Sequence, residues 1–534
     1  MSTLIPYDDI PYPSYAFQQT HPDRLATVAA LLGLSPAPVV QCRVLELGCA
    51  SGGNLIPMAY ALPQSSFVGI DLSQRQVADG QAAVSRLGLT NLDLRHGDIT
   101  QLGDELGTFD YIIAHGVYSW VPPHVRDALL TLCRTHLAPH GVAYISYNTL
   151  PGWSTLLPLR DVLRYRTRDA KTAEERLAMA YDLLERFATL AEDPSLPQSH
   201  ILVACRSFLE RQAGRTSLEG KSYTYHDILA EVNDPCLFTQ FAAHAAEHGL
   251  QYLAEADFHT VLPGNFAQPV AEELAALASD LIEMEQYMDF VRGRMFRRTL
   301  LCHAEAPVRR GLRPDRVMSL LSASRAVPVS PKPDMAQGAV EQFRAPNGST
   351  LSTNQAVSKV ALGVLAERWP APVAFGELLD AARARLESDG ERERDALALA
   401  SDLLAGYCYS AGLVELYSHT PPVASSVGER PLASLVVRSQ AERDDIVANL
   451  RHECVPLDEL QQALLPLLDG TRDREALADA LAAMVADGRL SLGEAPEGEE
   501  GDVRARLERG LEELLAGLAQ SALLVSERSH SVHL

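Results

Sequence analysis

The sequence predicts an α/β fold with a parallel, doubly wound sheet. Between Cys42 and Asn148, short runs rich in β-branched and aromatic residues alternate with amphipathic helical stretches. The first of these runs also ends in a glycine-rich turn that leads directly into a helical stretch. Such alternation is typical of β-α-β units, whose strands lie parallel in one sheet.

Seven runs are expected to be strands. Five belong to the alternating region, and two more follow a long helical stretch from about Trp153 to Gly249. We therefore interpret the helical stretch as an insertion before the last two strands. The expected strands are 42–47, 66–71, 92–97, 109–115, 141–148, 249–258 and 296–305. This interpretation gives a sheet domain in two segments, 1–165 and 240–310, and a helical insert over 166–239.

The remainder of the chain is expected to be mostly helical. Proline, serine and glycine accumulate before residue 350, which predicts a linker over 311–350. Three helices and a terminal strand are then expected twice, in 351–420 and again in 421–534, which suggests two small winged-helix-like units. The segment 493–502 within the second unit is expected to be an acidic loop.

Charge and composition exclude several classes of protein. The 534 residues carry a net charge of −23, which disfavours sequence-independent binding to nucleic acid. From residue 351 onward, 17 basic and 31 acidic residues give 17 − 31 = −14, so the winged-helix-like units are not expected to bind DNA. No apolar run approaches the roughly 18 residues of a membrane span. The eight cysteines form no C-x-x-C pair, so we expect no disulfide framework, no metal site and a cytoplasmic location.

The segment Val44–Asn54 is the strongest local signal for a bound ligand. The strand that contains Glu46 leads into a turn with Gly48, Ala50 and Gly53, where the backbone can approach a ligand and the next helix offers N–H donors. A dinucleotide pyrophosphate favours glycine at each position of G-x-G-x-x-G, and here the middle position is alanine. A carboxylate at Glu46 would also repel a pyrophosphate. The turn therefore favours a sulfonium cofactor with an amino-acid tail.

Carboxylates follow the second and third expected strands. Asp71 would reach the carboxyl edge of the sheet, where it can accept both hydroxyls of a ribose. Asp98 could accept from an adenine amino group, and Ile99 could pack on the ring. Aspartate also caps helices at strand ends, so these residues carry weight only together with the glycine turn.

Taken together, these motifs resemble a class I S-adenosylmethionine-dependent methyltransferase. More specifically, the chain resembles the bacterial protein-lysine methyltransferases that carry a methyltransferase regulatory domain and a winged-helix C-terminal region. The resemblance covers residues 5–305 closely and the rest more loosely. It implies a Rossmann-like, seven-stranded sheet, S-adenosylmethionine as cofactor and S-adenosylhomocysteine as product, with the regulatory domain in the helical insert. The matching motifs include VLELGCASGGN, FVGIDLS, HGVYSWVP, ISYNTLPGW and YMDFVRGRMFRRTLLCH.

The expected cofactor contacts lie in the N-terminal segment, the glycine turn and the ends of the second to fourth strands. The aromatic, proline-rich segment YPSYAFQQTHP is expected to close over the cofactor as a lid. The predicted cofactor-binding residues are Tyr12, Tyr15, His21, Glu46, Gly48, Ala50, Gly52, Asn54, Asp71, Leu72, Asp98, Ile99, His115 and Gly116.

The methyl acceptor imposes its own requirement. A lysine amine has an ordinary pKa near 10.4, so deprotonating it at pH 7 costs about 4–5 kcal/mol. Apolar surroundings and a nearby positive sulfonium favour the neutral amine. The loops after the fourth and fifth strands supply suitable aromatic and polar side chains. Tyr118 and Tyr147 are expected to orient the amine, with Trp120 and Trp153 as walls, His115 as a proton relay or cofactor contact, and Asn148 beside them.

Three functions remain open from the sequence. The leading hypothesis is an enzyme that methylates lysine side chains of another protein, whose docking would explain the length of the chain. A methyltransferase for a small-molecule amine or hydroxyl is the second, and a non-catalytic module that binds the cofactor is the third. Cys236 follows a proline, as in cytosine-C5 methyltransferases, but it lies in the helical stretch and is expected to be structural. The oligomeric state is not indicated.

Overall fold

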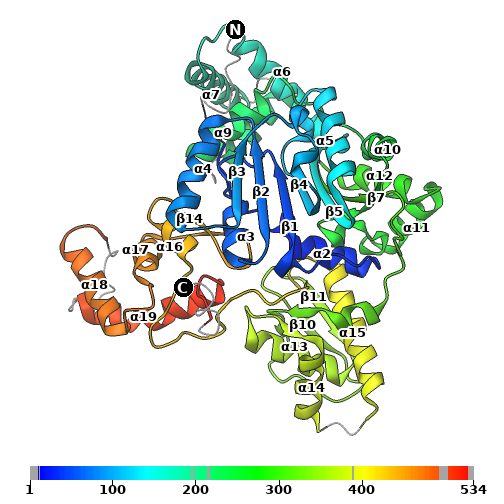
Figure 1. Ribbon diagram of the computed structural model, residues 1–534, viewed down its shortest axis with the longest axis vertical. Helices are drawn as coiled ribbons and strands as arrows, with labels where there is room; N and C mark the ends of the chain where they lie inside the picture. The colour runs from blue at the N-terminus through cyan, green and yellow to red at the C-terminus, as the bar shows by residue number, and fades with distance from the viewer. Residues whose placement is uncertain are drawn as a thin grey trace.

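One seven-stranded sheet organises the chain (Figure 1), in the order β3-β2-β1-β4-β5-β7-β6. The computed structural model describes residues 10, 12–193, 195, 199–212, 217–387, 390–491 and 503–526. Strands β1 to β5 are parallel, whereas β7 runs antiparallel to both β5 and β6. All seven expected strands are confirmed. They are β1 Arg43–Leu47, β2 Ser66–Asp71, β3 Leu92–His96, β4 Phe109–Ala114, β5 Leu137–Asn148, β6 Leu250–Glu255 and β7 Phe296–His303.

Helices cover both faces of the sheet. The chain runs outward from β1 to β3 and then returns to β4, so the strand order reverses beside β1, which is where open α/β sheets bind ligands. Helix α2 Pro22–Leu31 precedes β1. The helices that follow between the strands and cover the sheet are α3 Leu55–Ala61, α4 Gln74–Leu87, α5 Pro123–His136, α10 Phe238–Glu247, α11 Gln268–Leu277 and α12 Leu281–Arg292.

Alternation along β5 divides its side chains between two hydrophobic cores. Tyr144 packs into the core that α2, α3 and α4 cover. Ile145 and Tyr147 belong to the opposite core, under α5 and α10. Because successive side chains of a strand point to opposite faces, this division fixes which residues of β5 can reach the same site.

The helical insert lies at one end of the sheet, at the top of Figure 1. Its core includes Leu159, Leu184 and Phe208, and it packs against Trp153 of the loop after β5. Its helices are α6 Leu157–Arg166, α7 Ala173–Leu190, α8 His200–Gln212, α9 Ser217–Tyr223 and a π-helical turn Thr224–Ile228.

The predicted linker at 311–350 instead contains structured elements. The 3-10 helix Pro314–Ser319 and the strands β8 Leu321–Ala323, β9 Val327–Pro328 and β10 Glu341–Arg344 lie within it. Strand β8 is the central strand of a small sheet with β12 Val373–Ala374 and β13 Glu415–Tyr417. Two of the prolines lie within these elements, and Leu320 and Phe343 are buried. The buried Lys359 holds the segment, because its Nζ donates to the carbonyls of Asp334, Ala336 and Ala339.

The first C-terminal unit has the expected three helices and terminal strand. It lies below the sheet in Figure 1. Its elements are Pro314–Ser319, β8 Leu321–Ala323, β9 Val327–Pro328, β10 Glu341–Arg344, β11 Thr350–Thr353, α13 Ala356–Arg368, β12 Val373–Ala374, α14 Phe375–Leu386, α15 Arg392–Tyr409 and β13 Glu415–Tyr417.

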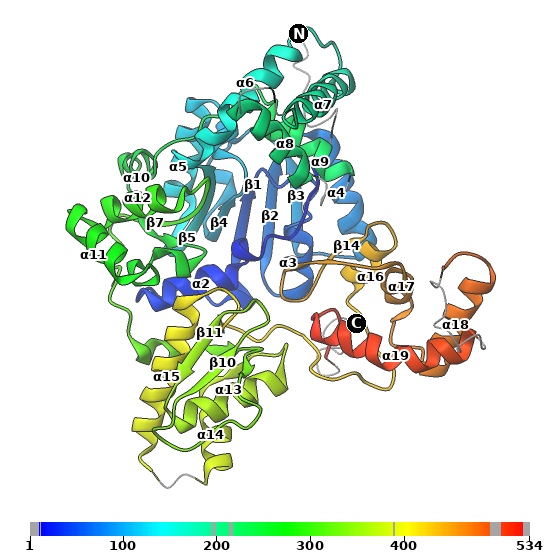
Figure 2. The ribbon, with the colours of Figure 1, turned by 180° about the vertical axis from the view of Figure 1, so that it is seen from behind.

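The second C-terminal unit lies beside α3 and α4, as Figure 2 shows from behind. It adds a helix and a hairpin before the three expected helices. The expected terminal strand is reduced to isolated bridges, Val423 with Val525 and Ala433 with Leu524. The predicted acidic loop 493–502 lies outside the described residues. The elements are α16 Leu435–Ala441, β14 Ile446–Ala448, β15 Cys454–Pro456, α17 Glu459–Leu464, α18 Arg474–Ala486 and α19 Val503–Gln520.

Within the described part of the chain, no helix has the length and apolar character required to cross a membrane.

Candidate active site

The turn after β1 forms a tight cradle at the carboxyl edge of the sheet. Gly48 and Gly52 have φ angles of +78° and +77°, which favour glycine. A Cβ on Gly48 would lie 2.6 Å from Val117 Cγ2, and one on Gly52 would lie 2.9 Å from Leu94 Cδ1. Side chains at these two positions would clash with neighbouring side chains, so the tight turn requires glycine there.

Ala50 adopts the same left-handed conformation without being glycine, with φ +50°. Its N–H donates to Asp71 Oδ2 at 2.8 Å, and Asp71 Oδ1 accepts from Ser73 N–H at 2.8 Å. An alanine in the left-handed conformation costs about 1–2 kcal/mol in conformational free energy. The hydrogen bond that Ala50 N–H donates to Asp71 offsets part of this cost. Asp71 therefore joins the ends of β1 and β2, in addition to its expected contact with a ribose.

The other residues predicted beside the adenosine lie on the β2–β3 side of the cradle. Leu72 is 51% exposed at the carboxyl end of β2. Asp98 and Ile99 follow β3 and are half-buried. Asp98 Oδ1 accepts from the backbone N–H and the hydroxyl of Thr100, both at 2.8 Å. Asp98 thus stabilises its own loop, beside which we expect the adenine ring to bind.

Glu46 lies buried beneath the cradle with one oxygen unpaired. Its Oε1 accepts from Asn54 Nδ2 at 2.8 Å, whereas Oε2 has no hydrogen-bond partner among the described residues. Burial raises the pKa of Glu46 to about 8. A buried, unpaired carboxylate oxygen fits the ammonium group of an amino-acid tail, which would supply the missing donor.

The N-terminal segment, which is expected to be a lid, contacts the cradle directly. Gly53 N–H donates to Ser14 Oγ at 2.8 Å, and Phe17 N–H donates to Asn54 Oδ1 at 2.9 Å. Farther out, Tyr12 OH contacts Asp227 of the insert at 3.4 Å.

His21, also expected in this lid, points elsewhere. Its ring caps α2 by accepting from Asp23 N–H at 3.2 Å, and it packs beside His419 and His452 of the C-terminal units. Burial, together with His419, lowers the pKa of His21 to about 3, so the ring is neutral at pH 7.

His115, at the end of β4, is the centre of a polar cluster inside an aromatic wall. Its Nδ1 lies 3.0 Å from Tyr144 OH and 3.2 Å from Ser146 Oγ. The ring of Phe17 lies on it, with centroids 3.9 Å apart, and Phe296 meets it edge-on at 6.1 Å. Burial and then Arg298 lower the pKa of His115 to about 3, so it is neutral at pH 7.

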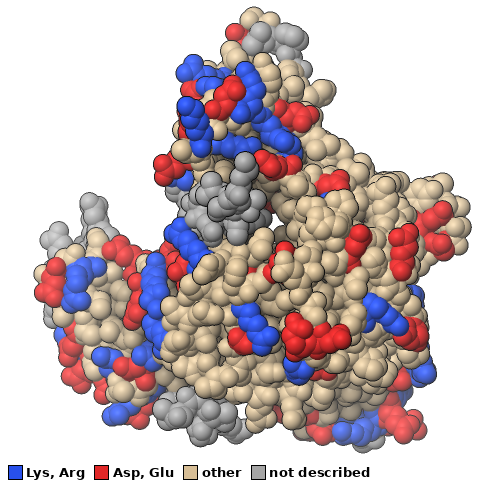
Figure 3. All heavy atoms as spheres, turned by 45° about the horizontal axis from the view of Figure 1, so that its top comes forward, with Lys and Arg blue, Asp and Glu red and all other residues tan. Residues whose placement is uncertain are grey.

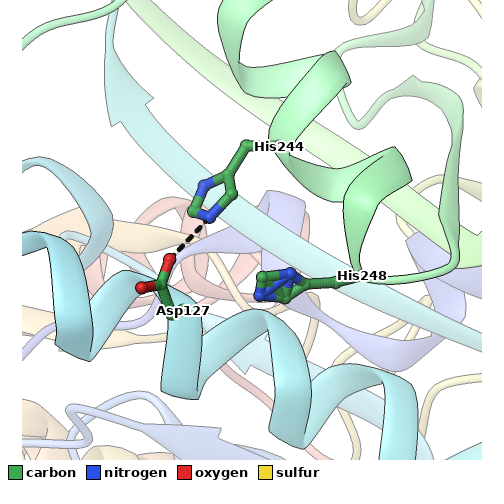
Figure 4. Close-up of side chains that lie close together, drawn as sticks. All are labelled: Asp127, His244 and His248. Atoms are coloured by element: carbon green, nitrogen blue, oxygen red, sulfur yellow. Dashed lines mark hydrogen bonds and ion pairs between the residues drawn. The ribbon is translucent and has the colours of Figure 1, made fainter.

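Tyr118 turns away from this cluster toward α10. Its hydroxyl lies 2.8 Å from His244 Nδ1, and His244 Nε2 lies 2.8 Å from Asp127 of α5. Figure 4 shows Asp127 and His244 together with His248. Each of these three residues offers one atom that could bind a metal ion, and the three atoms lie within 4.8 Å of one another. Direct methyl transfer needs no metal ion, so this group enters no step of the reaction proposed below.

Tyr147 is fully buried in the opposite core from His115. Its ring stacks on Phe241 at 4.1 Å, and its hydroxyl lies 3.1 Å from Thr299 Oγ1. Tyr118 and Tyr147 are neighbours, with centroids 5.7 Å apart, but both hydroxyls already have partners. The structure brings the predicted tyrosine pair together and leaves its role at the amine a prediction.

The remaining predicted residues lie where the loop after β5 meets the insert. Asn148 Nδ2 donates to Asn233 Oδ1 at 3.0 Å, while Asn148 Oδ1 is buried without a partner among the described residues. Trp153 is buried, and its Nε1 likewise has no partner in the described part of the chain. Trp120 is half-buried. Gly116 is exposed, and its N–H donates to Ser146 Oγ at 2.8 Å.

Tyr144, Ser146 and Phe17 are functional candidates that the sequence reasoning missed. The alternation of side chains along a strand could have predicted the residues of β5. Tyr144, Ser146 and Asn148 lie on one face, and Ile145 and Tyr147 lie on the other. Residues of β5 that share the face of His115 have even numbers. Tyr147 and Asn148, which were predicted to act together, cannot point to the same face.

Three family models match the chain. A methyltransferase domain model matches residues 44–141, which include the cradle, Asp71 and Asp98. A model described as a predicted methyltransferase regulatory domain matches residues 220–303, so it begins near the end of the predicted insert and includes β6 and β7. The C-terminal winged helix domain of PKMT matches residues 429–523, the second C-terminal unit.

Relatives match nearly all of this chain in sequence and in structure. The uncharacterized protein RP789 of Rickettsia prowazekii (strain Madrid E) is 34% identical over 97% of this chain and 94% of its own length. The structure of PKMT2 from Rickettsia typhi, solved also in complex with AdoHcy, superposes with a TM-score of 0.83 at 27% identity and covers 97% of this chain and 100% of that one. The trans-aconitate 2-methyltransferase of Deinococcus radiodurans is 34% identical over 19% of this chain. This chain is therefore an S-adenosylmethionine-dependent enzyme that belongs to the bacterial protein-lysine methyltransferase family of class I methyltransferases, with a regulatory domain and a winged-helix C-terminal region.

Proposed function

We propose that this enzyme N-methylates lysine side chains of another protein. The observation that carries the proposal is the shared architecture. The whole PKMT2 structure superposes on 97% of this chain, which includes the helical insert and the C-terminal units. A small-molecule methyltransferase would need the sheet domain alone. The C-terminal winged helix domain, whose family model is named for PKMT, would have no evident task in such an enzyme.

The cofactor fits the cradle in one orientation. Asp98 and Ile99 would hold the adenine and Asp71 the ribose, because they follow β3 and β2. The amino-acid tail would then lie over β1, where Glu46 Oε2 lacks a donor. When bound, S-adenosylmethionine supplies an electrophilic methyl group, and direct displacement by an amine leaves S-adenosylhomocysteine.

The residues of this chain would prepare the amine. The His115 ring is half-buried and, because its pKa is lowered to about 3, neutral at pH 7, so it adds no positive charge beside the incoming nitrogen. Asn148 Oδ1 has no donor, and a buried amide oxygen can orient an amine by accepting one of its hydrogens. Phe17 and the N-terminal segment would exclude water. The hydroxyls of Tyr118 and Tyr147 already contact His244 and Thr299, so these two side chains would stabilise the loops after β4 and β5.

The acceptor would be a protein with accessible lysines. The net charge of −23, of which −14 lies beyond residue 350, suits a basic partner through electrostatic attraction. The charge is not uniform: Figure 3 shows Lys and Arg gathered over the helical insert at the top of the view, with Asp and Glu among them. We propose docking on the C-terminal units, without a role for nucleic acid. The thiols of the eight cysteines are all free, which suits a location in the cytoplasm.

The test uses methyl-labelled S-adenosylmethionine with separate protein and metabolite fractions of the host. Acid hydrolysis of labelled protein should release methyl-lysine. The matched control is the same protein fraction after chemical acetylation of its lysines, which removes the nucleophilic amine and should prevent labelling. Label found only in small molecules would contradict the proposal and favour the second function. Cofactor binding without any transfer would contradict it and favour a non-catalytic binding protein.

A further inference from the structure

The second C-terminal unit inserts one side chain beneath the cofactor cradle. His452 lies in the tight hairpin between β14 and β15, is 3% exposed, and has its Nε2 2.8 Å from Asn54 Oδ1. Nearly 400 residues separate the two positions in the sequence. The winged-helix region, which lies far from β1 in the chain, therefore touches the residue that begins α3.

Asn54 uses all of its hydrogen-bonding capacity. Its Nδ2 donates to Glu46 Oε1 at 2.8 Å and to Thr20 Oγ1 at 3.0 Å. Its Oδ1 accepts from Phe17 N–H at 2.9 Å and from His452. The Thr20 hydroxyl lies 2.8 Å from Phe17 O and 3.1 Å from Asn54 Oδ1. With its single hydrogen on the closer acceptor, Phe17 O, Thr20 Oγ1 accepts from Asn54 Nδ2. Because a carbonyl oxygen only accepts, His452 Nε2 must carry the hydrogen.

The four hydrogen bonds of Asn54 connect Glu46, the N-terminal segment and the second C-terminal unit, whose positions together shape the expected cofactor site. Glu46 carries the unpaired oxygen expected at the amino-acid tail, and Phe17 packs on His115. If Asn54 rotated, Glu46 would lose its donor and the lid would lose its anchor at Phe17. The two donors that face Oδ1 fix the amide orientation, and one of them is His452.

The hairpin is built to hold His452 in place. Asn449 Oδ1 accepts from Arg451 N–H and Glu453 N–H, both at 2.9 Å, and Leu450 N–H donates to Ala522 O at 3.0 Å. Arg451 forms an ion pair with Glu415 of the first C-terminal unit. His452 itself has φ +62°, an uncommon backbone conformation for a residue other than glycine. A strained residue held at a domain contact indicates a function for its side chain.

We propose that His452 is a positioning residue for the cofactor site, which acts through Asn54 on Glu46 and on the lid. The catalytic sheet alone would then have an incompletely ordered site. Affinity for S-adenosylmethionine would depend on how the C-terminal unit docks, which gives that unit a role in cofactor binding beyond contact with a substrate. The proposal rests on the methyltransferase activity of the family and does not depend on which acceptor is methylated.

The test measures cofactor affinity in the full-length chain. His452→Phe keeps a buried ring but removes the donor, and it should raise the Kd for S-adenosylhomocysteine roughly three- to thirtyfold. The Kd for 5′-methylthioadenosine, which lacks the amino-acid tail, should change less than twofold. His452→Gln, whose amide nitrogen can take the place of Nε2, should restore most of the affinity.

Two controls separate positioning from general loosening of the interface. Cys454→Ala removes a contact of the same hairpin, from Sγ to Ala16 O at 3.3 Å, and should leave both affinities within twofold. In a double-mutant cycle, His452→Phe should add little once Asn54 is alanine, because the two residues act as one unit. Unchanged affinity in His452→Phe, equal losses for both ligands, or equal losses in Cys454→Ala would each overturn the proposal. Should His452→Phe fail to fold, His452→Leu, which also lacks the donor, replaces it in the binding assays and in the cycle with the same criteria.

Discussion

Gly53 N–H donates to Ser14 Oγ at 2.8 Å, and the backbone of Ser14 lies so close that a Cβ on Gly53 would be 2.0 Å from its carbonyl oxygen. The N-terminal segment thus rests directly on the backbone of the cofactor cradle. Ser14 belongs to the segment that the sequence predicts to be a lid, and the absence of a side chain at Gly53 lets this segment lie against the turn.

A Gly53→Ala substitution should therefore displace the lid. Because the clash is with backbone atoms, the segment must move, and we expect S-adenosylhomocysteine to bind at least tenfold more weakly. Isothermal titration calorimetry measures the change. Gly311→Ala is the matched control, since a Cβ there has open space around it. Deletion of the residues before Asp23 should have an effect at least as large. Normal affinity in both the deletion and the alanine variant would show that the segment is no lid.

Cofactor affinity should depend on pH through Glu46. Its pKa is raised to about 8 by burial, so the unliganded carboxyl is mostly protonated at pH 6 and mostly ionised above pH 8. If the ionised form binds the ammonium of the amino-acid tail, affinity falls as pH decreases from 8 to 6, by up to about tenfold per unit. Calorimetry across this range measures the slope. Glu46→Gln cannot ionise and should give weak binding with no slope, and a slope retained in that variant would assign the titration to another group.

Asp71 and Tyr118 should affect different steps. Asp71→Ala removes a charged acceptor of Ala50 N–H and of the expected ribose hydroxyls, and should raise the cofactor Kd by roughly ten- to a hundredfold. Tyr118→Phe removes only the bond to His244 and should leave the Kd within twofold while slowing methyl transfer several-fold. Binding assays and single-turnover rates separate the two effects. An equal loss of binding in both variants would contradict this division of roles.

Arg297 should be essential for stability. Its guanidinium is fully buried and pairs with Glu255, Glu285 and Asp289. Arg297→Met would leave the buried Glu285 without this cation, and Glu255 and Asp289 with Arg294 only. We expect a loss of about 3–5 kcal/mol in the free energy of unfolding, measured in urea. Arg313→Met breaks an exposed pair with Asp315 and should not change stability measurably. If the two variants were equally stable, the buried network would not be holding β6, α12 and β7 together.

The elements that the sequence predicts best are those that local rules control. Every strand of the sheet was predicted from alternation and β-rich composition, because each strand and its helix form a local β-α unit. The linker prediction failed for the opposite reason. Residues 311–350 have the composition of a loop, yet β8 pairs with β12 and β13, which follow it by about 50 to 90 residues. Composition carries no information on such distant partners.

The sequence by itself determined the sheet, the glycine cradle and the carboxylates at the ends of β1, β2 and β3, because backbone conformation and strand position follow from nearby residues. Only the tertiary structure decided which side chains share the site. Strand pairing set Tyr144 beside His115 and put Tyr147 in the opposite core. Domain docking brought His452 to Asn54. Both are contacts between residues distant in the chain, and their geometry depends on how the folded units pack against one another, which local sequence does not encode.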